Sequence, residues 1–219
     1  MDSETKDAHQ PEKTKTMIFN FTDNYQFTTR LNLNKENVEV VTETKLLGTI
    51  IQNDLKWDSN TAYIVKRANS RMILLRKLSE FGAPKDDLKT IYVSYIRSIL
   101  EQSAVVWHFS LTEENKQDLE RVQKTSLKII LKGRYSDYNN ALDILDLEDL
   151  NTRREKLCKK FATQSAKNAT LNFETNDKLY NINTRNQDKF KISFCHTERL
   201  KKSSIPQMQR MLNRIHKET

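Results

Sequence analysis

The stretch from Pro84 to Trp107 limits the possible folds more than any other part of the chain. Read as a helix with 3.6 residues per turn, it carries apolar side chains around most of its circumference. Only one narrow stripe is polar, formed by Thr90, Ser94, Arg97 and Glu101. Because a helix that is apolar on so many sides must be enclosed by other elements, the sequence predicts a helical domain built around this stretch.

The rest of the chain is predicted to be mostly helical, with a small β portion at its start. Only three glycines and three prolines are present, too few for the many turns of a sheet-rich protein. Alternating or continuous apolar runs predict short antiparallel strands at 13–21, 27–33, 38–41 and 45–51, the last with Gly48 in its middle. Helical periodicity follows in segments near 58–81, 84–107, 113–132, 138–145 and 148–167. We therefore expect an α+β fold that is predominantly α.

Composition shifts predict four parts along the chain. Residues 1–12 are polar and patternless and are expected to form a disordered lead-in. Residues 13–57 hold the strands, and residues 58–167 hold the helical domain. Residues 168–219 are expected to form a linker rich in Asn and Thr, a short strand at 189–194 and a basic tail, whose last helix opens at Pro206.

The positive charge lies entirely in the last third of the chain. Residues 1–150 contain 21 Lys and Arg against 23 Asp and Glu, whereas residues 151–219 contain 16 against 6. The net charges of −2 and +10 sum to the +8 of the whole chain. A strongly basic segment favours an anionic partner such as nucleic acid or an acidic protein surface, although a soluble basic tail is an equally simple interpretation.

Little in the sequence indicates a metal, a disulfide or a membrane. Cys158 and Cys195 have no partners at a metal-site spacing, and they are interpreted as thiols in a reducing compartment. The four histidines are scattered, with no nucleophile and base at a recognisable spacing. No apolar run of about 18 residues and no signal peptide is found, so the protein is expected to be intracellular, nuclear or cytoplasmic, with no membrane partner.

Five short sequence motifs are spread along the chain. The central stretch contains Leu88-Lys89, Tyr92, Ile96-Arg97, Leu100-Glu101 and Val106-Trp107. The others are Pro11 to Lys15 before Met17-Ile18-Phe19, Lys45 to Ile50 before Leu55-Lys56-Trp57, Leu119 to Lys124, and Arg199 to Pro206. Together they resemble the region that follows the catalytic residues in reverse transcriptases of non-LTR, LINE-type retrotransposons. The resemblance covers nearly all of residues 11–214.

The resemblance implies a fold and a function. Residues 13–57 would be the edge of the polymerase palm, with Lys45, Leu46, Leu47 and Gly48 as a primer-grip-like segment that approaches the primer end. Residues 58–167 would be the thumb. The chain would be the C-terminal part of an RNA-directed DNA polymerase, and its partners would be an RNA or DNA template–primer and the palm and fingers of such an enzyme.

The sequence departs from that family at the catalytic centre. These polymerases use two magnesium ions held by palm carboxylates, one of them in an aromatic-x-Asp-Asp turn. The only Asp-Asp pair here is Asp86-Asp87, which follows Pro84 at a predicted helix start, where the helix dipole accounts for two acids. We therefore expect no catalytic residue and no cofactor in this chain, and no polymerase activity from it alone.

Basic side chains are the candidates for nucleic-acid binding, since a duplex is held mainly through its phosphates. Three groups are candidates: Arg121, Lys124, Lys128 and Lys132 on one helix; Arg153, Arg154, Lys159 and Lys160 on the next; and Arg199, Lys201 and Lys202 in the tail. A solvated helix face is the alternative interpretation of each group. Tyr92, Tyr95 and Trp107 could stack on bases, but their helical spacing favours a place in the core.

The runner-up function is a helical protein-interaction scaffold, or a decaying retroelement remnant without activity. The acidic balance of residues 1–150 and the absent catalytic turn favour it.

Overall fold

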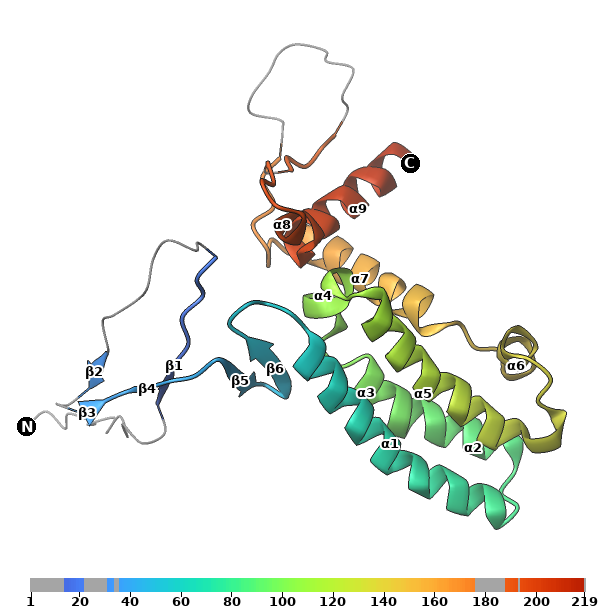
Figure 1. Ribbon diagram of the computed structural model, residues 1–219. Helices are drawn as coiled ribbons and strands as arrows, with labels where there is room; N and C mark the ends of the chain where they lie inside the picture. The colour runs from blue at the N-terminus through green and yellow to red at the C-terminus, as the bar shows by residue number, and fades with distance from the viewer. Residues whose placement is uncertain (1–13, 22–30, 34–35, 176–187, 193, 219) are drawn as a thin grey trace, which may run out of the picture. The chain divides into compact units, whose positions relative to one another are not determined.

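A computed structural model describes residues 14–21, 31–33, 36–175, 188–192 and 194–218 (Figure 1). The chain divides into two compact units, Met1–Asn60 and Thr61–Thr219. The fold is predominantly α with a small β portion, as predicted. The predicted lead-in at 1–12 lies outside the described residues.

The described residues of the first unit form three pairs of short strands. β1 (Lys15–Thr16) pairs in parallel with β4 (Glu39–Val40), and β2 (Asn32–Leu33) pairs antiparallel with β3 (Glu36–Asn37). β5 (Glu43–Leu46) pairs antiparallel with β6 (Thr49–Gln52). β1 and β4 are shorter than predicted, and they pair in parallel rather than antiparallel. Residues 27–30 of the strand predicted at 27–33 lie outside the described residues.

The segment at 45–51 is not one strand with a glycine in its middle, so that prediction was wrong. Leu46 pairs with Thr49, and the two residues between them form the turn of the β5–β6 hairpin. Leu47 and Gly48 have φ angles of 48° and 86°. A two-residue hairpin loop takes positive φ at both positions, which explains Gly48 and leaves Leu47 in an unfavourable conformation.

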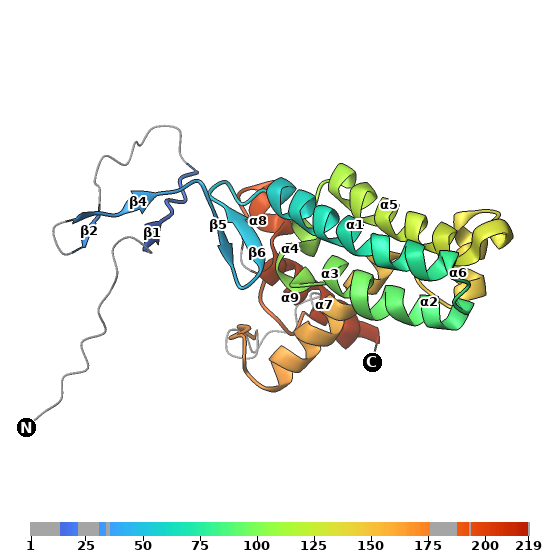
Figure 2. The same ribbon diagram turned by 90° about the horizontal axis from the view of Figure 1, so that it is seen from below.

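A group of helices forms the second unit. α1 (Asp58–Glu80) leads into the central stretch, which begins with α2 (Lys85–Ile91) and continues as a π-helical segment (Tyr92–Arg97) and α3 (Ser98–Leu100). α5 (Glu113–Leu131) follows this stretch. α1 and α5 run along this stretch in both views (Figures 1 and 2). The hydroxyl of Ser79 on α1 donates to the carbonyl of Ile129 on α5 at 3.0 Å. The central stretch is enclosed as predicted, with Leu88, Tyr92, Ile96 and Leu100 at most 2% exposed.

The central stretch is not one continuous helix, which corrects the prediction for 84–107. Ser94 and Ser98 each donate a hydroxyl hydrogen bond of 2.7 Å to the carbonyl four residues earlier, and such bonds compete with the helical ladder around the π-helical segment. The helix then ends at a turn where Ser103 has a φ of 55°. α4 (Ala104–Trp107) follows, and the indole Nε1 of Trp107 donates a hydrogen bond of 3.0 Å to the carbonyl of Gln102.

The C-terminal segment packs as part of the second unit. α6 (Tyr138–Leu145) leads to α7 (Leu150–Lys167), and later α8 (Glu198–Lys202) and α9 (Ser204–Glu218) follow. α9 lies against α7 through a small apolar cluster formed by Ala162, Phe173, Phe190, Met208 and Leu212. In the described part of 189–194 a single bridge between Thr175 and Phe190 takes the place of the predicted strand.

Candidate nucleic-acid interface

The first candidate group lies on α5. Thr112 caps this helix by accepting a hydrogen bond from the backbone N–H of Asn115 at 3.2 Å, and Glu113 and Glu114 occupy the first turn, as their acidic charge favours. Buried apolar side chains fill the opposite side. The exposed side carries the α5 stripe, namely Arg121, Lys124, Lys128 and Lys132.

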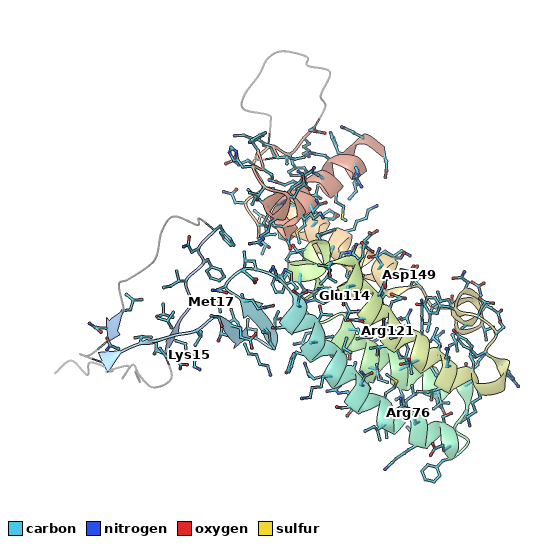
Figure 3. All side chains as sticks on the ribbon, in the orientation of Figure 1. Lys15, Met17, Arg76, Glu114, Arg121 and Asp149 are labelled. Atoms are coloured by element: carbon cyan, nitrogen blue, oxygen red, sulfur yellow. The ribbon has the colours of Figure 1, made fainter. Side chains whose placement is uncertain are left out.

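Each member of the α5 stripe interacts within the protein. Arg121, labelled in Figure 3, pairs with Asp118 at 2.6 Å. The ammonium groups of Lys124 and Lys128 lie 4.9 and 5.3 Å from the ring centres of Tyr138 and Tyr135. Lys132 is the helix C-cap rather than a helical residue, and it donates to the carbonyl of Ser79. The stripe is exposed, but its charged groups already interact with other groups of the protein.

α7 carries a second basic face that the sequence interpretation found only in part. Asp149 (Figure 3) caps the helix by accepting a hydrogen bond from the backbone N–H of Thr152 at 2.9 Å. Its buried residues recur at helical spacing, and they are Leu150, Arg154, Cys158, Ala162 and Ser165. Counted at 100° per residue, the opposite side of the helix carries the lysine face, which we define as Lys156, Lys159, Lys160 and Lys167.

Fewer side chains of the lysine face than of the α5 stripe interact with other groups of the protein. Its side chains, with Thr163 and Gln164, line a surface hollow of about 460 Å³. Lys156 pairs with Glu148. Within the described part of the chain, Lys159, Lys160 and Lys167 form no ion pair. No acidic residue occurs between 156 and 167, so the net charge of this face is positive despite the pair between Lys156 and Glu148.

Arg154 does not belong to any surface, which corrects its place among the candidates. Its side chain is fully buried, and its Nε donates to Nδ1 of His108 at 3.4 Å. Both terminal nitrogens are buried without a hydrogen-bond partner in the described part of the structure. The guanidinium carbon lies 5.8 Å from the ring centre of Trp107. Arg154 therefore belongs to the core and does not meet a phosphate.

This environment changes the titration of both side chains. Burial, and then the neighbouring charges of Arg154 and Lys116, lower the pKa of His108 to about 4. Burial also lowers the pKa of Arg154, while the carboxylates of Glu120, Glu101 and Asp149 act in the opposite direction. His108 is therefore neutral at physiological pH and accepts the hydrogen bond.

The remaining candidate residues lie at the surface, and some of them form ion pairs within the protein. Arg153 pairs with Glu101 at 3.1 Å, and that carboxylate also pairs with Arg97 at 3.3 Å. On α8, Lys201 pairs with Glu198 at 3.1 Å. Arg199 and Lys202 are exposed on the same short helix.

The primer-grip-like segment lies in the first unit. Leu46 and Leu47 are 57% and 90% exposed at the tip of the β5–β6 hairpin, with Lys45 beside them. The hairpin thus presents two apolar side chains and a cation at one tip.

Two motif stretches meet in a buried hydrogen-bond network. Gln123 accepts from the hydroxyl of Tyr92 and donates to the hydroxyl of Tyr138 at 2.8 Å and to the carbonyl of Glu148 at 2.9 Å. Tyr138 in turn donates to Glu120, whose carboxylate also accepts from the backbone N–H of Leu150 at 3.2 Å. Burial raises the pKa of Tyr92, so its hydroxyl stays protonated and donates. These motif residues join α5, α6, α7 and the central stretch, and their role here is structural.

The three aromatic residues that the sequence offered for base stacking are Tyr92, Tyr95 and Trp107. Tyr92 and Trp107 are buried in the core. Tyr95 is partly exposed, but the guanidinium of Arg71 covers its ring at 4.1 Å from the centre. None of the three offers a free stacking surface in the described structure.

Comparison of the chain with protein-family models, curated proteins and solved structures finds no match. Among the described residues, no three His, Cys, Asp or Glu side chains gather in a way that could hold a metal ion. In the same part of the chain, none of the helices combines the length and the apolar character needed to cross a membrane.

Proposed function

We propose that this chain binds an RNA or DNA template–primer without sequence preference through the lysine face of α7. The single observation that carries the proposal is this face, with four lysines and no acid, and with three of the lysines outside any ion pair of the described structure. The sequence motifs support the wider setting. They resemble the last palm strands, the thumb and the basic tail of a non-LTR retrotransposon reverse transcriptase.

The dimensions of the face suit a nucleic-acid strand. Lys156 and Lys167 are eleven residues apart, which is about 16 Å along a helix. One strand of a duplex places a phosphate about every 3.4 Å along its axis, so the face spans about five nucleotides. Contacts of this kind position a duplex and do not read its sequence. Polymerisation is not part of the proposal, because the aromatic-x-Asp-Asp turn does not occur in this sequence.

The salt dependence of binding tests the proposal. The affinity for a blunt RNA–DNA hybrid is measured by fluorescence anisotropy between 50 and 200 mM salt. Each lysine that neutralises a phosphate contributes about −0.9 to the slope of log K against log salt. The triple variant K159Q/K160Q/K167Q should therefore bind more weakly, with a slope about three units less steep.

The α5 stripe provides the matched control. The variant R121Q/K124Q/K128Q removes the same charge, but from side chains that already interact with Asp118, Tyr138 and Tyr135. It should change the slope less than the α7 variant does. Equal effects of the two variants would assign binding to the overall charge, and no binding of the wild type at 50 mM salt would refute the proposal.

A protein-interaction scaffold is the second candidate, and the end of α1 favours it. Ile73 and Leu74 are 53% and 43% exposed, and Phe81, just after the helix, is 87% exposed. Exposed apolar side chains of this size are typical of protein-binding surfaces. A stoichiometric protein complex that survives nuclease treatment and is lost in F81S would support this candidate.

A further inference from the structure

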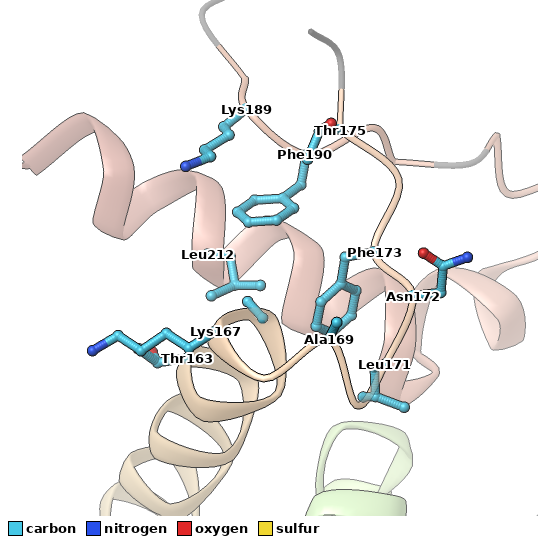
Figure 4. A pocket seen from close by; sticks show the side chains of 11 residues that line it. Thr163, Lys167, Ala169, Leu171, Asn172, Phe173, Thr175, Lys189, Phe190 and Leu212 are labelled. Carbon is cyan, nitrogen blue, oxygen red and sulfur yellow. The ribbon is translucent and has the colours of Figure 1, made fainter. Parts of the chain in front are cut away.

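A pocket of about 410 Å³ opens next to the lysine face. It lies between the end of α7, the segment that follows it, the segment at 189–190 and α9 (Figure 4). Phe173, Phe190 and Leu212 supply its apolar wall, and Lys167 and Lys189 supply its charge. The two lysine side chains extend to the same side of the pocket in Figure 4. This volume is within the range of sites for small ligands.

The apolar wall is held in place by specific contacts. The side chain of Asn213 on α9 brackets Phe190: its Oδ1 accepts from the backbone N–H at 2.8 Å, and its Nδ2 donates to the carbonyl at 2.9 Å. The rings of Phe190 and Phe173 meet edge to face with their centres 6.0 Å apart. Each ring is 9% exposed, and the ammonium of Lys189 lies 5.9 Å from the centre of the Phe190 ring, so the wall presents a small aromatic surface that is fixed before a ligand binds.

The charged side chains among the described residues that line the pocket all have one sign. The described residues that line it include two lysines and no carboxylate. Two acids adjoin lining residues in sequence and do not line the pocket themselves: Glu174 pairs with Lys191 at 3.2 Å, and Asp188 pairs with Lys217 at 2.8 Å. The pocket therefore combines an aromatic wall with two cations at one side. The matching ligand is a planar ring that bears an anionic group.

The pocket is continuous with the lysine face. Thr163 and Lys167 line both the pocket and the surface hollow of that face. A strand whose phosphates follow the lysines of α7 toward its C-terminal end arrives at the pocket. Nucleotides supply both required groups, since each carries a planar base that is linked through its sugar to a phosphate, and bases pack against aromatic side chains irrespective of sequence.

We propose that this pocket holds the base of an unpaired nucleotide at the end of the strand that the lysine face binds, with its phosphate between Lys167 and Lys189. The proposal rests on the proposed function and adds a preference for a frayed or overhanging end over a blunt one. Stacking of one base on an aromatic side chain corresponds to an affinity gain of about fivefold or more.

The test compares a blunt RNA–DNA hybrid with the same hybrid carrying a two-nucleotide single-stranded overhang, at one salt concentration. The ratio of the two affinities is measured for the wild type, K189Q and K191Q. Lys191 lies two residues from Lys189 and does not line the pocket, so K191Q is the matched control. The overhang should bind about fivefold or more tightly to the wild type and K191Q, and K189Q should lose most of this gain.

A second variant, F190L, tests the aromatic wall without changing any charge. F190L preserves an apolar side chain in the cluster but removes the ring, and it should also reduce the gain, with folding checked by circular dichroism. Equal affinities of the wild type for both hybrids, or equal ratios for K189Q and K191Q, would overturn the inference. The proposed function fails separately, if K159Q/K160Q/K167Q binds the blunt hybrid as the wild type does.

Discussion

Lowering the pH from 7 to 5 should destabilise the helical unit through one buried histidine. His108 is 2% exposed, and the guanidinium of Arg154 lies against it with Nε 3.4 Å from Nδ1. The pKa of His108 is lowered to about 4, against 6.5 for an unperturbed histidine. Because the folded pKa is below the unfolded one, the unfolded state takes up the proton first as the pH falls.

The magnitude follows from these two pKa values. A difference of about 2.5 pKa units corresponds to at most about 3.4 kcal/mol, reached only below the folded pKa. The contribution to the free energy of unfolding is fully present above pH 6.5 and is lost as the pH falls through 4. Between pH 7 and 5 the expected loss from this residue is about 2 kcal/mol.

Urea unfolding of the wild type and His108→Asn at pH 7, 6 and 5 measures this loss. Asparagine keeps an acceptor near the position of Nδ1 but does not titrate, so the other titrating groups contribute alike to both proteins. The wild type should lose about 2 kcal/mol more than the variant over this range. A parallel decline of the two proteins would refute the reasoning, since it would mean that the buried pair does not exclude the proton.

Three further predictions concern other parts of the structure. Burial raises the pKa of the Cys158 thiol to about 12, so a thiol reagent at pH 8 should modify Cys195 rapidly and Cys158 only after unfolding, as peptide mapping would show. Gln123→Leu should lower the free energy of unfolding by about 2 kcal/mol or more, because it leaves buried partners unpaired, whereas Gln117→Leu on the exposed side of the same helix should change it little. Leu47→Asn should slow amide exchange in the β5–β6 hairpin, because asparagine tolerates positive φ, and unchanged exchange would contradict the strain at this turn.

Local signals predicted the helices well. Thr112 begins α5 because its hydroxyl accepts from the backbone N–H of Asn115, and the acids after it suit a helix start. The end of α1 near Gly82, which has a φ of 81°, follows from the same kind of local chemistry. Such features depend on neighbouring residues only, which is why the sequence is sufficient to find them.

Features that depend on distant partners were missed. Arg154 falls at helical spacing with Leu150 and Cys158, but its charge favoured an exposed position, and its acceptor, His108, is 46 residues away in the sequence. The break at Ser103 was hidden because apolar periodicity resumes in α4. The lysine face was found only at Lys159 and Lys160, although its i, i+3, i+4, i+11 spacing opposite the buried residues could have been read in full.

The two faces of α7 have a common origin with a consequence for recognition. The same helix fixes Arg154 in the interior and carries four lysines on its outer side. The distances between the backbone positions of those lysines are therefore set when the protein folds. The polyanion that we propose as the ligand would meet cations whose attachment points are already fixed. Only the flexible side chains remain to be immobilised, so little of the attraction is spent on organising the scaffold itself.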